Sequence, residues 1–370
     1  MNRLSKLEEL PDEMLLEVFI RQAYPNVAGR DSSDRNALFP HRRVSKRLRD
    51  LIDHHVIGRV KSLLMITPKA WMNEASLILY TGLEELKLYA NSFALGDASL
   101  SQLTRLKVLR LPTGSKITGE CFPSLTALRR LELCTPTLAL AESLHLLPDL
   151  ESLSLSANNK VTDEHLFGFR ALKELDLCDD TGLMGTCLKK MPSLSHIVLH
   201  GDSRITGLET ATGLVSLELS YCHSFRDADL LKLAKTLKEL TLKTNRHISG
   251  GVLRAMLSLE SLMLRDERKL TDDDLAHLCQ LKRLSLYMCE RGFKACTFLP
   301  FLATTLYELD LGNSVPTDLS PLCHYEHLHS LYYSSDTLTQ ELALSIKANN
   351  EKVVAMLRES GCVIRDSLLQ

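Results

Sequence analysis

One pattern limits what this chain can fold into: a Leu-x-x-Leu-x-Leu signature that occurs twelve times, most often 22 residues apart. The first copy is Leu83, Leu86 and Leu88, and the others begin at residues 106, 128, 150, 172, 194, 214, 237, 259, 281, 306 and 328. Of the 36 framework positions 34 are leucine, and the exceptions are Ile197 and Tyr333. Since a fixed period of this length is typical of stacked repeats, the sequence predicts a solenoid.

The repeat that begins at Leu150 shows what one unit does. Leu153 and Leu155 alternate with serines on a short strand, so the leucines point inward while Ser154 points outward. Thr162 follows where a short helix is expected to begin, because its hydroxyl can accept a bond from the amides of the first turn. Further repeats share this layout at 117–125, 225–233, 248–256 and 270–278.

The ninth position of several repeats carries a small polar or polarisable side chain that can satisfy backbone amides in the turn: Asn91, Asn158, Cys222, Asn245 and Cys289. With the leucine signature, this pattern resembles the leucine-rich-repeat family and its cysteine-containing subclass. The resemblance implies an α/β fold, a right-handed solenoid (horseshoe) with a parallel inner sheet. We assign residues 58–336 to it, including a degenerate first strand at 60–65.

Both ends of a solenoid need a cap, because a terminal repeat otherwise exposes half of its core. At the C-terminus, residues 337–370 are expected to form a helical cap. Thr337 to Ala348 and Glu351 to Leu357 read as two amphipathic helices, and the stretch resembles the second half of an ankyrin unit.

Residues 1–57 form a separate N-terminal segment with two predicted helices. The first runs from Leu10 to Ile20, begins with a proline suited to the first helical turn, and is apolar on nearly every side. The second is amphipathic, with an apolar stripe at Val44, Leu48, Leu51 and Ile52. A helix that is apolar all round must be buried on more than one side, which favours a partner.

This segment resembles an F-box, whose pattern has a Leu-Pro-Asp-Glu start and a later Val-x-Lys/Arg-x-Trp helix. Here Leu48 stands where tryptophan is usual, and the polar stretch 23–35 is longer than the family normally has. The resemblance implies a substrate-recognition subunit of a cullin-RING (Skp-cullin-F-box type) ubiquitin ligase. By analogy, the residues that contact a Skp-type adaptor include Leu10, Pro11, Leu15, Leu16, Val18, Phe19, Val44 and Leu48.

The alternating strands also predict a binding face, because every second side chain points away from the core. We expect a protein substrate to bind there, at candidate residues Tyr89, Arg110, Glu132, Glu174, Asp176, His196, Glu218, Glu239, Arg265, Tyr287 and Tyr332. Four neighbouring carboxylates among them, Glu174, Asp176, Glu218 and Glu239, could seat a basic segment. The alternative is that these are simply solvated strand residues.

Composition argues against other classes of protein. Lys+Arg 44 against Asp+Glu 46 gives no net attraction for nucleic acid or an anionic membrane, and no apolar stretch is long enough to cross a bilayer. The basic run His41 to Arg49 is explained as the solvent-exposed face of the second predicted helix. The ten scattered cysteines contain no Cys-x-x-Cys pair, which favours a reducing compartment. We expect a location in the cytoplasm or nucleus, or inside a host cell if the chain is an effector.

No catalytic or cofactor motif is present. Gly250-Gly251 lacks phosphate-loop spacing, and the grouping of Cys323, His324, His327 and His329 is interrupted by framework residue Leu328. We therefore expect no enzyme activity, cofactor or metal. The remaining alternative to a ligase subunit is a non-catalytic interaction scaffold or inhibitor, whose N-terminal helices only cap the solenoid.

Overall fold

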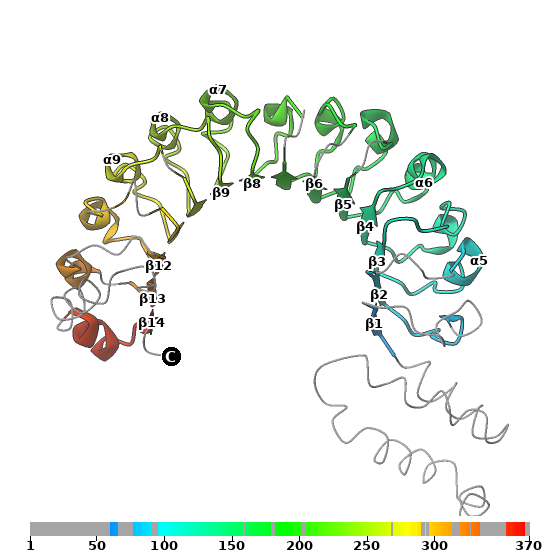
Figure 1. Cartoon of the computed structure of the whole chain (residues 1–370), viewed down its shortest axis with the longest axis horizontal. Coiled ribbons are helices and arrows are strands. Elements are labelled where there is room, and N and C mark those ends of the chain that lie inside the picture. The colour runs from blue at the N-terminus through cyan, green and yellow to red at the C-terminus, as the bar shows by residue number, and fades with distance from the viewer. Residues whose placement is uncertain are drawn as a thin grey trace, which may run out of the picture. The chain divides into compact units, whose positions relative to one another are not determined.

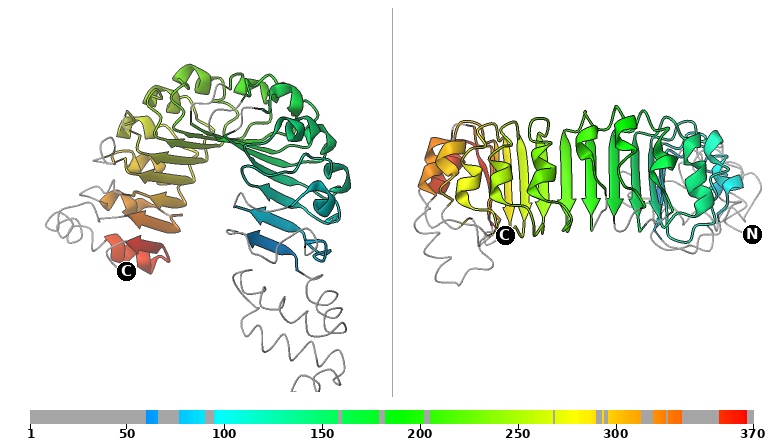
Figure 2. Two further views of the ribbon diagram at one scale, coloured as in Figure 1. Left: turned by 45° about the vertical axis from the view of Figure 1, so that its right-hand side comes forward. Right: turned by 90° about the horizontal axis from the view of Figure 1, so that it is seen from above.

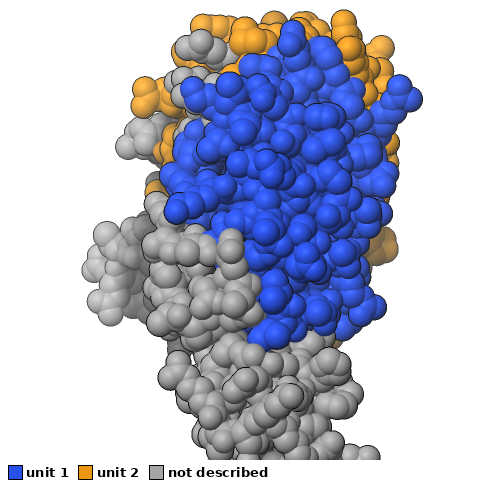
Figure 3. All heavy atoms as spheres, turned by 90° about the vertical axis from the view of Figure 1, so that its right-hand side faces the viewer, with its two compact units in different colours: residues 1–172 blue, residues 173–370 orange. Residues whose placement is uncertain are grey.

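The computed structural model describes residues 60–65, 77–89, 95–157, 160–178, 182–201, 205–267, 269–289, 293, 296–312, 319–325, 327–333 and 353–366. The chain divides into two compact units, Met1–Leu172 and Lys173–Gln370, coloured separately in Figure 3. The N-terminal segment 1–57 and the predicted helix at 337–348 lie outside the described residues.

Unit 1 contains a sheet of parallel strands that pair in sequence order. Its strands are β1 (Ser62–Met65), β2 (Glu85–Leu88), β3 (Val108–Leu111), β4 (Arg130–Cys134) and β5 (Ser152–Ser156). The degenerate first strand predicted at 60–65 is therefore confirmed as β1.

Unit 2 repeats the arrangement, again with parallel neighbours in sequence order. Its strands are β6 (Glu174–Cys178), β7 (His196–His200), β8 (Ser216–Ser220), β9 (Glu239–Lys243), β10 (Ser261–Arg265), β11 (Arg283–Tyr287), β12 (Glu308–Asp310), β13 (Ser330–Tyr333) and β14 (Val363–Asp366). In each unit the strands line the inner side of the curve and short helices lie on the outer side (Figures 1 and 2). The leucine-rich-repeat fold is thus confirmed.

The core of each repeat is built from the framework leucines. Every framework position is buried except Tyr333, and most have no exposed surface. Because partner strands pair leucine with leucine, as Leu262 does with Leu240 and Leu284, each buried side chain packs against its equivalents in the neighbouring repeats. Each buried leucine stabilises the fold by about 1.5 to 3 kcal/mol relative to an exposed one.

The outer helices are shorter than ordinary α-helices, and several are 3-10 helices. In unit 1 they are α5 (Asp97–Leu100), η4 (Phe122–Ser124), α6 (Leu138–Ser143), η5 (Leu144–Leu146) and η6 (Asp163–Leu166). In unit 2 they are η7 (Leu188–Lys190), η8 (Leu208–Thr210), α7 (Asp227–Leu231), α8 (Gly250–Leu253), α9 (Asp272–Leu275), η9 (Leu299–Leu302) and η10 (Ser320–His324). Each covers one layer of leucines, so one or two buried apolar residues per helix are enough.

Capping bonds occur between repeats as well as within a helix. Within α6, Thr137 accepts a bond from the amide of Leu140, as expected for a helix start. Asp97 does more, since its carboxylate accepts bonds from the backbone amides of Thr118, Gly119 and Cys121 in the next repeat, at 2.8 to 3.0 Å. This carboxylate therefore ties two repeats together.

A residue in the left-handed conformation follows many strands and turns the chain. Thr135, Tyr221, Thr244 and Asp266 all have φ between 50° and 58° there. The backbone amide of each donates to the last carbonyl of the following strand, as from Thr244 to Arg265 at 2.9 Å. This bond extends the hydrogen bonding between neighbouring strands by one residue beyond each strand end. It offsets the backbone strain of a non-glycine residue with positive φ.

The C-terminal segment differs in part from the expected helical cap. Residues 353–359 are helical, which overlaps the second predicted helix. Val363–Asp366 then forms β14, which pairs in parallel with β13. The alternation of Cys362 and Ile364 is too short to indicate a strand, so the sequence did not predict this last strand of unit 2.

We predict that Leu262→Ala and Met263→Ala, one residue apart, have opposite outcomes. Leu262 is 1% exposed, so its truncation leaves a cavity that should lower the free energy of unfolding by about 2 to 5 kcal/mol. Met263 points outward, so its truncation should lower the free energy of unfolding by less than about 0.5 kcal/mol. Urea unfolding followed by circular dichroism measures both, and equal losses would contradict the alternation.

Candidate functional site

The outward side chains of the strands form the candidate site in each unit. The predicted substrate-binding residues all lie on strands or directly after one, and each is exposed or half-buried: Tyr89, Arg110 and Glu132 in unit 1, and Glu174, Asp176, His196, Glu218, Glu239, Arg265, Tyr287 and Tyr332 in unit 2. Their outward placement agrees with the sequence prediction, and their binding role stays a prediction. The eight predicted adaptor-contacting residues, from Leu10 to Leu48, lie outside the described part of the chain.

In unit 1, three of the predicted residues contact one another. The Arg110 guanidinium carbon lies 4.5 Å from the centre of the Tyr89 ring, and its Nη1 lies 2.7 Å from Glu132 Oε2. Arg110 Nη2 also donates to Cys134 Sγ at 3.6 Å. A cation held this way between an aromatic face and a carboxylate is restricted in its rotamers, so this part of the surface is pre-organised.

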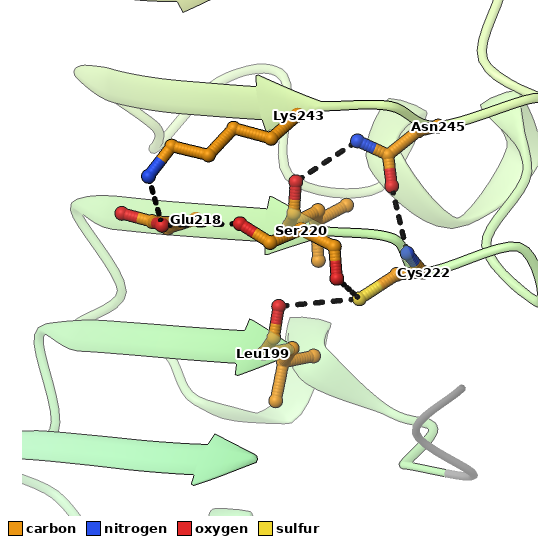
Figure 4. A network of polar contacts seen from close by, with 7 residues as sticks. Leu199, Glu218, Ser220, Cys222, Lys243 and Asn245 are labelled. Carbon is orange, nitrogen blue, oxygen red and sulfur yellow. Dashed lines mark hydrogen bonds and ion pairs between the residues drawn. The ribbon is translucent and has the colours of Figure 1, made fainter. Parts of the chain in front are cut away.

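In unit 2, the acidic stretch expected from the sequence is partly neutralised. Glu218 Oε1 lies 2.6 Å from Lys243 Nζ and also accepts a bond from Ser220 Oγ at 3.1 Å (Figure 4). Glu239 Oε1 lies 2.7 Å from Arg283 Nη2, two strands away. Two of the four carboxylates that could seat a basic segment therefore already have internal cationic partners.

Farther along the inner side of unit 2, the exposed side chains are larger and less polar. Met263, Tyr287 and Tyr332 are 42%, 41% and 37% exposed, respectively. The Arg265 guanidinium carbon lies 5.1 Å from the centre of the Tyr287 ring. We call Met263, Arg265, Tyr287 and Tyr332 the aromatic strip. Tyrosine and arginine are the residue types that often dominate binding energy at protein interfaces.

A hollow of about 370 Å³ lies beyond the carboxyl ends of β9 and β10. Thr244, Asn245, Arg246, Asp266 and Lys269 line it, and we call it the edge hollow. Arg246 and Lys269 are exposed, whereas Asn245 is buried. The repeat pattern did not predict this group, because its members lie in the turns after the strands, outside the alternating positions.

Beneath the turns of unit 2 runs a buried ladder of ninth-position side chains. Asn245 Oδ1 accepts the amide of Cys222 at 3.0 Å, and Asn245 Nδ2 donates to the carbonyl of Leu219 at 2.9 Å. Cys222 Sγ in turn donates to the carbonyl of Leu199 at 3.2 Å (Figure 4). The predicted role, satisfying a backbone amide in the turn, is confirmed for Asn245. The Cys222 thiol instead donates to backbone carbonyls. Asn91 and Asn158 lie outside the described residues.

The next residue of the ladder is Glu267, an acidic residue that the repeat pattern did not predict there. Its Oε1 accepts the backbone amide of Asn245 at 2.7 Å and Asn245 Nδ2 at 3.2 Å. Glu267 is 1% exposed. Burial raises the pKa of its carboxyl group from 4.5 to about 7, against the opposing effect of the bonds from Asn245. Near neutral pH the carboxyl group of Glu267 is therefore only partly ionised.

The described residues provide neither a metal-binding group nor a membrane-spanning helix. They include no set of three His, Cys, Asp or Glu side chains placed to hold a metal ion. The ring of His329 stacks on Tyr307, with 5.0 Å between the ring centres. In the same part of the chain, no helix has the length and apolar character needed to span a bilayer.

Comparison with known proteins supports the fold. No protein-family model and no curated protein matches this chain. Among solved structures, the Toll–Spätzle complex of Drosophila matches with a TM-score of 0.50 and 16% identity, over 81% of this chain and 46% of that one. The chain therefore spans less than half of that protein. At this level of identity the likeness shows the leucine-rich-repeat fold and nothing finer.

Two other similar structures have lower TM-scores. An internalin from Listeria monocytogenes matches with a TM-score of 0.46 and 21% identity, over 74% of this chain and 80% of that one. The Rad7 and Elc1 complex from yeast matches with a TM-score of 0.39 and 17% identity, over 89% of this chain and 95% of that one.

The buried carboxyl group leads to a prediction about pH. Because the pKa of Glu267 is raised in the folded state, the folded chain binds more protons than the unfolded chain between about pH 4.5 and 7. Stability is therefore lost as pH rises through this window, by about 3 kcal/mol in total. In Glu267→Gln the amide oxygen can still accept the bonds from Asn245, so this loss should disappear.

The measurement is the free energy of unfolding of wild type and Glu267→Gln at pH 5 and pH 8. We expect similar stability at pH 5 and a more stable variant at pH 8. The exposed Glu164→Gln is the matched control, for which the difference from wild type should not change with pH. If Glu267→Gln lowered the free energy of unfolding equally at pH 5 and pH 8, burial would not raise the pKa of Glu267.

Proposed function

We propose that this chain is a non-catalytic substrate-recognition subunit of a cullin-RING ubiquitin ligase. In this proposal, the F-box-like segment 1–57 binds a Skp-type adaptor, and the inner faces of the repeats bind the target protein. Ubiquitin transfer is carried out by partner subunits, in the cytoplasm or nucleus.

The observation that carries the binding role is the aromatic strip on the inner side of unit 2. The strands beneath it are held in register by hydrogen bonds and by buried leucines, so the exposed side chains are presented from a rigid base. Interface cores are enriched in tyrosine, methionine and arginine, which are the residues found here. A rigid surface of this kind can bind a protein with little loss of conformational entropy.

The adaptor role is supported by the sequence ahead of the repeats. The sequence predicts that Leu10-Pro11-Asp12-Glu13 begins a helix that is apolar nearly all round, and that Val44-Ser45-Lys46-Arg47 belongs to a second helix. Such a segment is too small to bury these residues by itself, which favours a partner. An F-box-like segment followed by leucine-rich repeats is the arrangement that the proposed ligase subunit requires.

We predict that Leu15→Ala/Phe19→Ala abolishes copurification of the full-length chain with a coexpressed Skp-type adaptor. Each side chain is expected to bury enough apolar surface to contribute about 1.5 to 3 kcal/mol, so their loss should weaken binding at least about a hundredfold. The circular dichroism and melting temperature of the repeats should stay unchanged.

The matched control is Leu138→Ala/Phe301→Ala, which removes the same two residue types from exposed positions, 54% and 60% exposed, outside the strands. This control should copurify like wild type. An adaptor that fails to copurify with wild type, or that binds the Leu15→Ala/Phe19→Ala variant equally well, would reject the ligase role and leave the interaction scaffold.

A further inference from the structure

Three basic side chains at the carboxyl ends of β9 and β10 have no acidic partner among the described residues. Arg265, Arg246 and Lys269 are exposed, and none forms an ion pair with another described residue. This differs from the neighbouring strands, where Lys243 and Arg283 are paired with Glu218 and Glu239. Arg246, Arg265 and Lys269 therefore give this part of unit 2 an excess of positive charge among the described residues.

Apolar surface lies directly beside this charge. In the register of β10 and β11, Arg265 is opposite Tyr287, and Met263 is two residues before Arg265 on the same outward side. Tyr287 and Met263 are each more than two-fifths exposed. Because adjacent strands are about 4.8 Å apart, one extended segment can contact all three side chains.

The edge hollow continues this surface past the strand ends. Two of its lining side chains, Arg246 and Lys269, are basic, and one, Asp266, is acidic. Asp266 directly follows Arg265 in the sequence, so the hollow begins where the strip of β10 ends. With Arg265 included, three cations stand against one carboxylate.

We propose that this surface, formed by Met263, Arg265, Tyr287 and the edge hollow, binds an acidic segment of a partner protein that also carries apolar side chains. The proposal rests on the proposed function, because it names the class of substrate that the inner face of unit 2 selects. Met263 and Tyr287 contact the apolar side chains. Arg265, Arg246 and Lys269 pair with the carboxylates.

The chemistry of the surface favours this partner over two others. A guanidinium that lies over an aromatic ring keeps N–H donors that point outward in its own plane, and these match the two oxygens of a carboxylate. A basic segment would meet carboxylates that already have partners, Glu218 and Glu239. A nucleic acid would place phosphates near Asp266 and leave Met263 without an apolar partner.

The test uses the full-length chain and four fluorescent probes, with binding followed by fluorescence anisotropy. The peptides are about ten residues long, enough to cross four strands. One mixes Glu and Asp with Leu and Phe, a second has Lys in place of the acids, and a third has Ser in place of Leu and Phe. The fourth probe is a single-stranded RNA of similar length.

We expect the acidic, apolar peptide to bind at least about tenfold more tightly than the other three probes, and more weakly as salt rises. The variant Arg265→Glu/Lys269→Glu should bind this peptide at least about tenfold more weakly than wild type. The variant Arg265→Ala/Lys269→Ala should weaken binding by a smaller factor. Met263→Ala/Tyr287→Ala should weaken it as well. The control Arg105→Glu/Lys235→Glu reverses two exposed cations that lie outside the strands, and should bind like wild type.

Three results would overturn the proposal: tighter binding of the basic peptide or the RNA, no binding of any probe at millimolar concentration, or equal weakening by the control. Melting temperatures show that each variant is folded. Because the adaptor experiment depends on residues 1–57, adaptor binding together with any of these results would reject the acidic partner while leaving the ligase role intact.

Discussion

The structure depends on stacking buried leucines in register between parallel strands. A leucine such as Leu240 has no core of its own, and it is covered only because Leu217 and Leu262 occupy the same place in the adjacent repeats. The side-chain period of a strand is two, so burying one set of residues commits the alternate set to the surface. The core and the binding face are therefore two results of one constraint.

That surface is shaped by interactions between repeats more than within them. Glu218 pairs with Lys243 across 25 residues, and Glu239 with Arg283 across 44. These pairs cancel charge on one part of unit 2, whereas Arg265 on another part has no acidic partner in the described part of the chain. Pairing with neighbouring repeats thus decides which charges remain available to a partner.

The sequence predicted the features that follow from the period, namely the strands, the buried framework and the outward placement of residues such as Glu218 and Tyr287. It did not predict the left-handed turn residues, because Thr244 and Tyr221 lack the usual glycine or asparagine signal and adopt positive φ through a backbone bond to the next strand. Glu267 was missed because a glutamate is usually exposed. Ion pairs also escaped prediction, since side-chain reach across one or two strands is not encoded in the repeat.

The most direct test of the central claim is hydroxyl-radical footprinting of the full-length chain with mass spectrometry. Met263 and Tyr287 lie on the outward columns, whereas Met256 and Tyr325 are buried counterparts of the same residue types. We predict rapid oxidation of Met263 and Tyr287 and strong protection of Met256 and Tyr325. Equal oxidation of Met263 and Met256, or of Tyr287 and Tyr325, would contradict the stacking that separates the core from the binding face. Protection of Met263 would contradict it as well.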